Sequence, residues 1–258
     1  MIRKLDWDSD FFGLSIGNIE ISTLDPADAA KQVKQYLKDS QDSFDLLFVS
    51  SITQLDLGLL SELDILDVGA RVVFAKELIP DDPALVKQVR DTRIDNLQSE
   101  ICPIELLRLA ETSGAWSRFK LDSKLPAGSF HRLYHTWIER SVSREIADEV
   151  YVYRDDTEIV AMATMSWRQD NIGVIGLIAV KANQRSLGIG TKLMQHIERE
   201  SKDSGVKAIH VTTQDKNHRA CAFYQHNGFK EIKRSNIYHL WINQANTTTS
   251  AGINQESR

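Results

Sequence analysis

The segment NQRSLGIGTKLMQHI, residues 183–197, decides the fold of this chain. It begins as a polar loop with two glycines, Gly188 and Gly190, and continues as a helix. Glycine lets a backbone approach a ligand closely, and a helix N-terminus presents free N–H groups at the positive end of its dipole. The segment therefore predicts an anion-binding turn, although Gly-x-Gly alone also fits an ordinary turn before a helix.

Two common phosphate-binding motifs do not fit this segment. A P-loop has Gly-Lys followed by Ser or Thr, whereas the second glycine here precedes Thr191-Lys192, the reverse order. A dinucleotide-binding fingerprint needs a third glycine where Leu193 stands. The segment does fit Arg-x-x-Gly-x-Gly, a pattern that suits a pyrophosphate, with Arg185, Gly188 and Gly190.

Composition limits the classes of protein. The chain has 258 residues, 42% of them hydrophobic, and a net charge of −5, which argues against a general nucleic-acid-binding surface. Its two cysteines, Cys102 and Cys221, are not paired in spacing, which indicates a reducing compartment and no structural zinc. The first residues lack the pattern of a signal peptide, and no hydrophobic run approaches membrane-spanning length. We expect a soluble cytoplasmic protein with no membrane partner.

The first third of the chain reads as a small α/β domain. Strand-like pieces at 16–21, 44–50 and 70–78 accompany one helical pattern at 27–39. Pro80 and Pro83 then interrupt the chain and indicate a boundary. We predict a small N-terminal domain over residues 1–85, a second domain over 86–243 and a disordered tail over 244–258, because that tail is polar and small.

The second domain has a clearer order of elements. Helical patterns at 104–114 and 130–142 are separated by a polar loop at 117–129. Three β-rich runs are separated by short connections. The glycine segment then leads into a helix, which is followed by a strand, a second helix and an extended stretch. The β-rich runs span 149–154, 159–168 and 172–180, and the later elements span 191–205, 208–214, 217–228 and 231–242. This order predicts an α/β (α+β) fold with a mixed, mostly antiparallel central sheet.

A second motif follows the glycine segment. In NHRACAFYQHNGF, Asn217 precedes Tyr224 by seven residues, so the two fall on one helix face. Together with Arg185, Gly188 and Gly190, these residues resemble the GNAT superfamily of acetyl-CoA-dependent N-acetyltransferases. The resemblance covers roughly residues 89–241 and implies the GNAT fold, with acetyl-CoA as cosubstrate.

The resemblance also implies a set of site residues. In that superfamily the glycine loop grips the pyrophosphate of coenzyme A, strand backbone groups bind the pantetheine arm, and the later Asn and Tyr face the arm and the thioester. The implied cofactor-binding residues are Ile178, Ala179, Val180, Arg185, Ser186, Leu187, Gly188, Ile189, Gly190, Thr191 and Asn217. Tyr224 resembles the general acid that protonates the departing thiolate, since a phenol with a pKa near 10 is protonated at neutral pH. The alternative is that Tyr224 is a packing residue.

Three short pieces resemble one branch of the superfamily, the TDP-fucosamine acetyltransferases of bacterial surface-polysaccharide synthesis. They are WDSDFFGLSIGNIEI from Trp7, SRF at 117–119 and LYHTWIERSV from Leu133. This likeness implies a nucleotide-linked amino sugar, acetylated on its amino group, and an N-terminal domain that contributes to the acceptor pocket. Substrate contacts would then come from Ser117, Arg118 and Phe119. Arg118 could bind a phosphate by a forked pair of hydrogen bonds or simply be solvated.

Other roles stay unassigned. No carboxylate occupies the run at 172–180, where many relatives place a general base, and Glu77 lies far along its strand, so a water chain is an equal candidate. His131 and His135 have zinc-like spacing, but Arg132 stands where a metalloprotease motif needs Glu, and we predict no metal.

Two rival functions stand beside the amino-sugar reaction. One is acetylation of another amine, such as a protein N-terminus or a polyamine. The other is a GNAT fold used only as a binding module, which should have lost the loop glycines or Tyr224. The oligomeric state is open, with a homodimer as one option.

Overall fold

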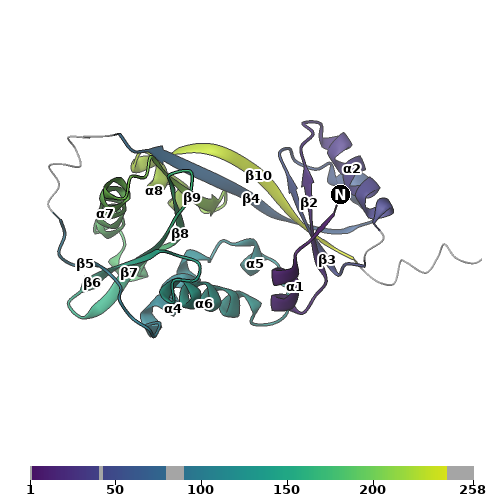
Figure 1. The fold of residues 1–258 in the computed structure, drawn as a ribbon. Coiled ribbons are helices and arrows are strands. Elements are labelled where there is room, and N and C mark those ends of the chain that lie inside the picture. The colour runs from purple at the N-terminus through teal and green to yellow at the C-terminus, as the bar shows by residue number, and fades with distance from the viewer. Residues whose placement is uncertain (1, 41–42, 80–89, 243–258) are drawn as a thin grey trace, which may run out of the picture. The chain divides into compact units, whose positions relative to one another are not determined.

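The computed structural model describes residues 2–40, 43–79 and 90–242. The chain forms two compact units, unit 1 with Met1–Gly69 and Ser235–Arg258, and unit 2 with Ala70–Arg234. Two strands, β4 (Asp64–Glu77) and β10 (Lys230–Trp241), carry the chain from one unit to the other (Figure 1). The boundary predicted at residues 85 and 86, and the tail predicted at 244–258, lie outside the described residues. The two units divide after Gly69, within β4, and again after Arg234, within β10.

Unit 1 is a small α/β unit. Its elements are β1 (Arg3–Lys4), α1 (Asp6–Phe12), β2 (Ile16–Ile21), α2 (Pro26–Asp39), β3 (Leu46–Ser51) and the 3₁₀ turn η1 (Leu57–Leu60). Strands β2 and β3 are parallel and are connected through α2, while β1 and the end of β10 pair antiparallel at either side. Helix α2 begins one residue before the predicted helix at 27–39, and the Asp25 carboxylate caps it by accepting a 2.8 Å hydrogen bond from the Asp28 N–H.

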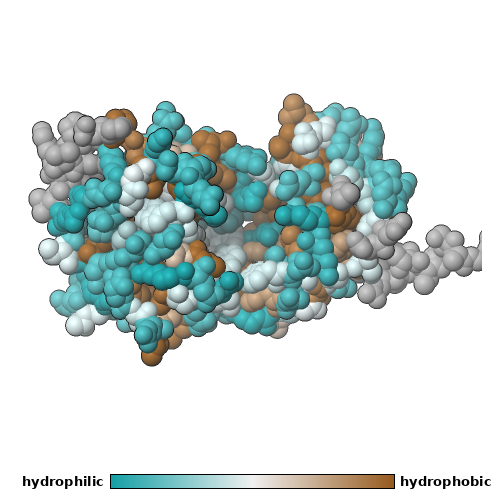
Figure 2. Space-filling model, viewed as in Figure 1, coloured by the Kyte–Doolittle hydropathy of each residue, from teal (hydrophilic) through white to brown (hydrophobic). Residues whose placement is uncertain are grey.

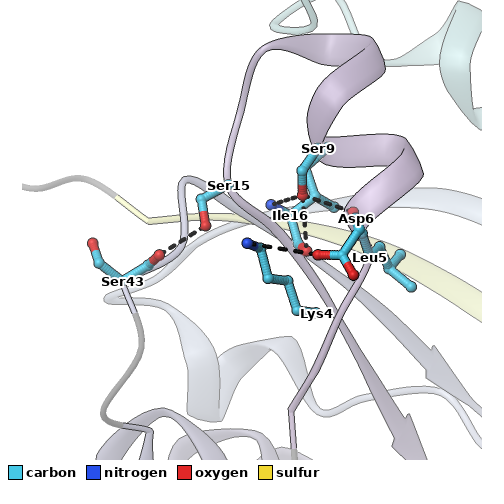
Figure 3. Close-up of polar contacts among 7 residues, drawn as sticks. All are labelled: Lys4, Leu5, Asp6, Ser9, Ser15, Ile16 and Ser43. Carbon is cyan, nitrogen blue, oxygen red and sulfur yellow. Dashed lines mark hydrogen bonds and ion pairs between the residues drawn. The ribbon is translucent and has the colours of Figure 1, made fainter.

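Helix α1 had no counterpart in the sequence prediction, and the hydrogen bonds around Ser9 explain why it forms (Figure 3). The Ser9 hydroxyl donates to the Leu5 carbonyl at 2.7 Å and accepts from the Ile16 N–H at 3.0 Å. A neighbouring bond runs from the Ser15 hydroxyl to the Ser43 carbonyl at 2.8 Å. These contacts join α1 to the start of β2, so the helix depends on partners that periodicity cannot reveal.

Unit 2 is built on a mixed sheet in the order β4-β9-β8-β7-β6-β5. The strands not yet introduced are β5 (Ile94–Asn96), β6 (Glu149–Asp155), β7 (Glu158–Trp167), β8 (Ile172–Val180) and β9 (Ala208–Gln214). Every pair in this order is antiparallel except β8 and β9, which are parallel. The mixed, mostly antiparallel sheet predicted from sequence is confirmed.

Helices cover both faces of this sheet (Figure 1). They are α4 (Ile104–Ser113), α5 (Arg118–Leu121), α6 (Ser129–Val142), the 3₁₀ turn η2 (Ala182–Gln184), α7 (Ile189–Asp203) and α8 (His218–His226). Helix α4 packs on β7, β8 and α6. Helices α7 and α8 bury their hydrophobic residues against alternate side chains of the same strands, among them Ala161, Ala163 and Ile175. This alternation is the period-2 pattern of a sheet buried on both faces.

One predicted loop is partly helical. Residues 118–121 form α5, whereas the sequence indicated a polar loop from 117 to 129. Phe119 turns into the interior, 9% exposed, and its ring packs edge-on against Trp137 at 6.0 Å. Burial of that single aromatic residue fixes a helical turn inside an otherwise polar stretch, which is tertiary packing overriding local composition.

The surface in view is mostly hydrophilic on each unit, with hydrophobic residues in small separate groups (Figure 2). Among the described residues, no helix is both long and hydrophobic enough to cross a membrane.

Candidate functional site

The parallel strands β8 and β9 separate partway along their length. Their pairing covers only Ile172–Ile175 of β8 and 208–211 of β9. Beyond it, β8 remains paired with β7 as far as Val180, and β9 remains paired with β4 as far as Gln214. After Ile175, the edge of β8 that faces β9 therefore has no strand partner among the described residues.

The hydrogen-bond ladder shows which backbone groups face this opening. The Lys181 N–H donates to the Val160 carbonyl at 2.8 Å, which makes these two a hydrogen-bonded pair. Antiparallel ladders alternate, so the backbone groups of Ala179 point to β7, whereas those of Ile178 and Val180 point away from it, toward the opening. The backbone groups of Ile178 and the N–H of Val180 are thus available to an extended ligand, whereas the Val180 carbonyl accepts from Arg185 and the backbone groups of Ala179 point to β7.

The glycine loop leads from the end of β8 into α7. Ser186 and Gly188 both have positive φ angles, 65° and 77°. Gly188 is the N-cap residue of α7 and offers no capping side chain. In the described part of the chain, no protein acceptor pairs with the backbone N–H groups from Leu187 to Thr191. A run of unpaired N–H groups at a left-handed turn and helix start is a typical anion-binding concavity.

The second glycine of the loop has a different role. A Cβ atom on Gly190 would lie 3.1 Å from the Phe223 ring of α8, tighter than ordinary contact. Gly190 therefore allows α7 and α8 to pack closely. By contrast, a Cβ on Gly188 would meet nothing within 4 Å, and that position needs glycine for its φ angle.

Two arginines border the loop without a carboxylate partner among the described residues. Arg185 donates from Nε to the Val180 carbonyl at 3.0 Å, and Arg219 of α8 donates to the Ser186 hydroxyl at 3.4 Å. Burial, and then the charge of Arg219, lower the pKa of Arg185 from its usual value. Two neighbouring guanidinium groups repel each other, so an anion between them would be favoured. The sequence motifs did not single out Arg219.

Tyr224 lies on α8, and Asn217 immediately precedes that helix. Asn217 is the N-cap residue, and its side-chain oxygen accepts from the Ala220 N–H at 3.2 Å. Tyr224 is 4% exposed, packs against the Phe74 ring at 5.7 Å and belongs to the core between sheet and helices. Burial, with a smaller contribution from Cys221, raises the pKa of the Tyr224 phenol well above its usual value. The phenol is therefore protonated at neutral pH and is a weaker acid than an exposed tyrosine.

The three predicted substrate residues differ in exposure. Ser117 is 2% exposed and begins α5, and Phe119 is buried against Trp137. Arg118 is half-buried, with its guanidinium 4.5 Å from the centre of the Phe119 ring. Of the three, only Arg118 has the exposure that contact with a substrate needs.

The histidine pair of α6 is occupied by a carboxylate. Glu111 of α4 accepts from His131 at 3.0 Å and from His135 at 2.6 Å. No cluster of histidine, cysteine and acidic side chains suited to a metal occurs among the described residues.

Glu77, the carboxylate considered as a base, lies opposite Ala208, which pairs with Ile172. The strands separate only after Val211, which is about 10 Å further along β9. Glu77 is therefore at the closed end of the β8–β9 pair, away from the opening.

Comparisons with known proteins concern the sequence of unit 2 and the fold. Residues 113–229 match the sequence profile of the Acetyltransferase (GNAT) family. An uncharacterized protein of Bacillus subtilis (strain 168), YxbD, is 34% identical over 76 residues, which are 30% of this chain. That match spans 46% of the length of YxbD, so it covers about half of this curated relative.

Two solved structures show a similar fold. A functionally unknown conserved protein of Staphylococcus epidermidis has a TM-score of 0.56 at 16% identity, over 92% of this chain and 90% of that one. A Drosophila protein has a TM-score of 0.50 at 14% identity, over 89% of this chain and 73% of that one. The match to the family profile therefore lies wholly within unit 2, and the two solved structures show a shared fold.

Proposed function

We propose that this protein transfers the acetyl group of acetyl-CoA to an amine. The opening between β8 and β9 carries the proposal. It presents the backbone groups of Ile178 and the Val180 N–H to an extended ligand and leads directly to the unpaired N–H groups at the start of α7. An extended amide-containing arm with a pyrophosphate at one end matches that order of groups, and the pantetheine and pyrophosphate of acetyl-CoA have this form.

Tyr224 is the proposed general acid. Acetyl transfer from a thioester releases a thiolate, which a nearby protonated group stabilises by donating its proton. The phenol of Tyr224 is protonated at neutral pH, as an unperturbed phenol is, and its hydroxyl has no hydrogen-bond partner among the described residues. Asn217 keeps α8 in place through its cap and would orient that helix along the pantetheine arm.

The proposed acceptor is the amino group of a nucleotide-linked amino-deoxy sugar of bacterial surface-polysaccharide synthesis. The support is the sequence likeness to TDP-fucosamine acetyltransferases and the partly exposed Arg118, whose guanidinium suits a sugar-nucleotide phosphate. Sugar nucleotides and acetyl-CoA are both cytoplasmic metabolites, so the proposed reaction would take place there. Another amine, such as a protein N-terminus or a polyamine, is the alternative acceptor.

The test has two stages. Acetyl-CoA should raise the melting temperature of the full chain, because a ligand that binds only the folded state stabilises it. A panel of TDP- and UDP-linked amino sugars is then incubated with acetyl-CoA while free thiol is measured, with the matching sugars that lack the amino group as controls. Thiol release that depends on the amino group supports the sugar proposal. If acetyl-CoA stabilises the protein but no sugar gives thiol release, and spermidine or a peptide N-terminus does, the acetyl transfer is supported and the acceptor is another amine.

A further inference from the structure

Strand β8 contains one residue more than β7 at the point where β8 leaves β9. Ala163 is opposite Ile178, and Met165 is opposite Ile175, so a single residue of β7, Thr164, faces both Gly176 and Leu177. This is a β-bulge, which bends a strand and increases its twist. The bulge begins directly after Ile175, the last residue of β8 that pairs with β9.

The side chain of Thr164 replaces the missing ladder contact. Its hydroxyl accepts a hydrogen bond of 2.9 Å from the Leu177 N–H, and both residues are buried. Gly176 makes room for this bond, since a Cβ there would lie 2.8 Å from the Thr164 hydroxyl oxygen. Without that hydroxyl, the Leu177 N–H would be a buried donor with no acceptor.

The bulge also changes which residues face each side of β8. Ile175 packs into the core beneath α7 and α8, and after the bulge Ile178, rather than Leu177, packs against the same core. The extra residue also determines which residues of β8 form hydrogen bonds with β7, and it thereby leaves the Ile178 backbone groups pointing toward the opening. The position of those groups therefore depends on the bulge, and the bulge is held by Thr164.

We propose that Thr164 is a positioning residue for acetyl-CoA: its hydroxyl holds the bulge that aims the Ile178 backbone at the bound thioester arm. This inference rests on the proposed function for the identity of the ligand. Thr164 acts through Leu177 and does not itself contact the ligand.

The experiment compares Thr164→Val, which keeps the shape and removes the hydroxyl, with Thr164→Ser, which keeps the hydroxyl. Calorimetric titration of the full chain with acetyl-CoA should show roughly tenfold weaker binding for Thr164→Val, the effect of about one hydrogen bond. Thr164→Ser should bind within about twofold of wild type, a difference too small to reflect a lost hydrogen bond. Hydrogen exchange should show faster exchange of the Leu177 amide in the valine variant only.

Two further variants keep the result decisive. Gly176→Ala should weaken acetyl-CoA binding as Thr164→Val does, because it displaces the hydroxyl without removing it, and it is used if the valine variant does not fold. Ile197→Val removes one methylene from the core on α7 and controls for lost stability alone. Wild-type affinity in a folded Thr164→Val or Gly176→Ala variant, or equal weakening in Thr164→Ser, overturns the positioning role. If the wild-type protein binds no acetyl-CoA, the proposed function is wrong. In that case, slow exchange of the Leu177 amide in Thr164→Val would also show that the Thr164 hydroxyl does not stabilise the bulge.

Discussion

Unit 2 contains two successive strand–turn–helix segments, and their helices begin differently. The first runs from β8 into α7, whose N-cap Gly188 has no side chain and leaves the N–H groups of the first turn unpaired. The second runs from β9 into α8, whose N-cap Asn217 accepts a hydrogen bond from an N–H group of the first turn through its own side chain. A capped helix start is complete without a ligand, whereas an uncapped start with positive φ angles is suited to bind an anion. From this comparison we predict that the start of α7 binds the anion and that α8 supports the site.

The largest effect that tests this division should come from α8. Tyr224→Phe removes one hydroxyl and little volume, so kcat should fall about 10²- to 10⁴-fold if the phenol is the general acid. Affinity for acetyl-CoA should stay close to wild type, because the α7 loop is unchanged. Single-turnover rates and melting curves are measured together. A folded variant that reacts at the wild-type rate would leave Tyr224 as a packing residue between Phe74 and Phe229.

The second effect concerns the start of α7. Gly188→Val places a β-branched residue at a φ angle of 77°, a strain of about 1–2 kcal/mol or more. Acetyl-CoA affinity measured by calorimetry should fall at least roughly tenfold, since the loop must change to relieve that strain. Gly188→Asn is the matched control, because asparagine tolerates this conformation and should retain more of the affinity. Equal affinity in wild type and the valine variant would mean that Gly188 is not at the anion site.

A smaller loss is expected at Arg219, which borders the α7 loop from α8. Arg219→Gln should weaken acetyl-CoA binding by about 1 kcal/mol, several-fold, and should reduce the salt dependence of binding, because one attractive charge is lost. Lys202→Gln removes the same charge from the last turn of α7 and should have no such effect. Similar changes in the two variants would indicate a general charge effect and not a contact at the loop.

Removal of the α8 cap should act on stability more than on binding. Asn217→Ala should lower the free energy of unfolding by about 1 kcal/mol, whereas Asn217→Asp, which can still cap, should lose little. Asp25→Ala removes an equivalent cap from α2 in unit 1 and gives the matched loss. If acetyl-CoA affinity falls in Asn217→Ala but not in Asp25→Ala, Asn217 also contacts the ligand, and the simple division between the helices must be revised.

The smallest effect should be a pH dependence of stability from α7. Burial lowers the pKa of His196 from its ordinary value of 6.5, with Glu200 opposing that shift and Arg199 and Arg90 adding to it. Because the folded state binds this proton less readily than the unfolded state, stability from His196 is present above pH 6.5 and is lost as pH falls through its lower folded pKa. Melting curves of His196→Gln should show a smaller loss of stability between neutral and mildly acidic pH. If stability depends on pH in the same way in His196→Gln and in the wild-type protein, His196 is not the source of this pH dependence.

Sequence patterns alone determined the order of elements in unit 2. The β-rich runs of β6 to β8, the short connections between them and the helical pattern of α7 are local, so each could be read without knowing its neighbours. The same patterns located the glycine loop, Asn217 and Tyr224. What they missed depends on distant partners: α1 forms around the hydroxyl of Ser9, and α5 forms because Phe119 is buried against Trp137.

The tertiary structure alone decided how the site is put together. Sequence spacing could not show that β8 leaves β9 after Ile175, because pairing is a property of two strands that lie more than 30 positions apart in the chain. Nor could it show that Gly190 serves helix packing while Gly188 serves the turn, since both glycines are identical in the motif. The bulge at Thr164 is a mismatch in register between β7 and β8. A register exists only once the strands are aligned, and so this feature of the site belongs to the fold and not to any single segment.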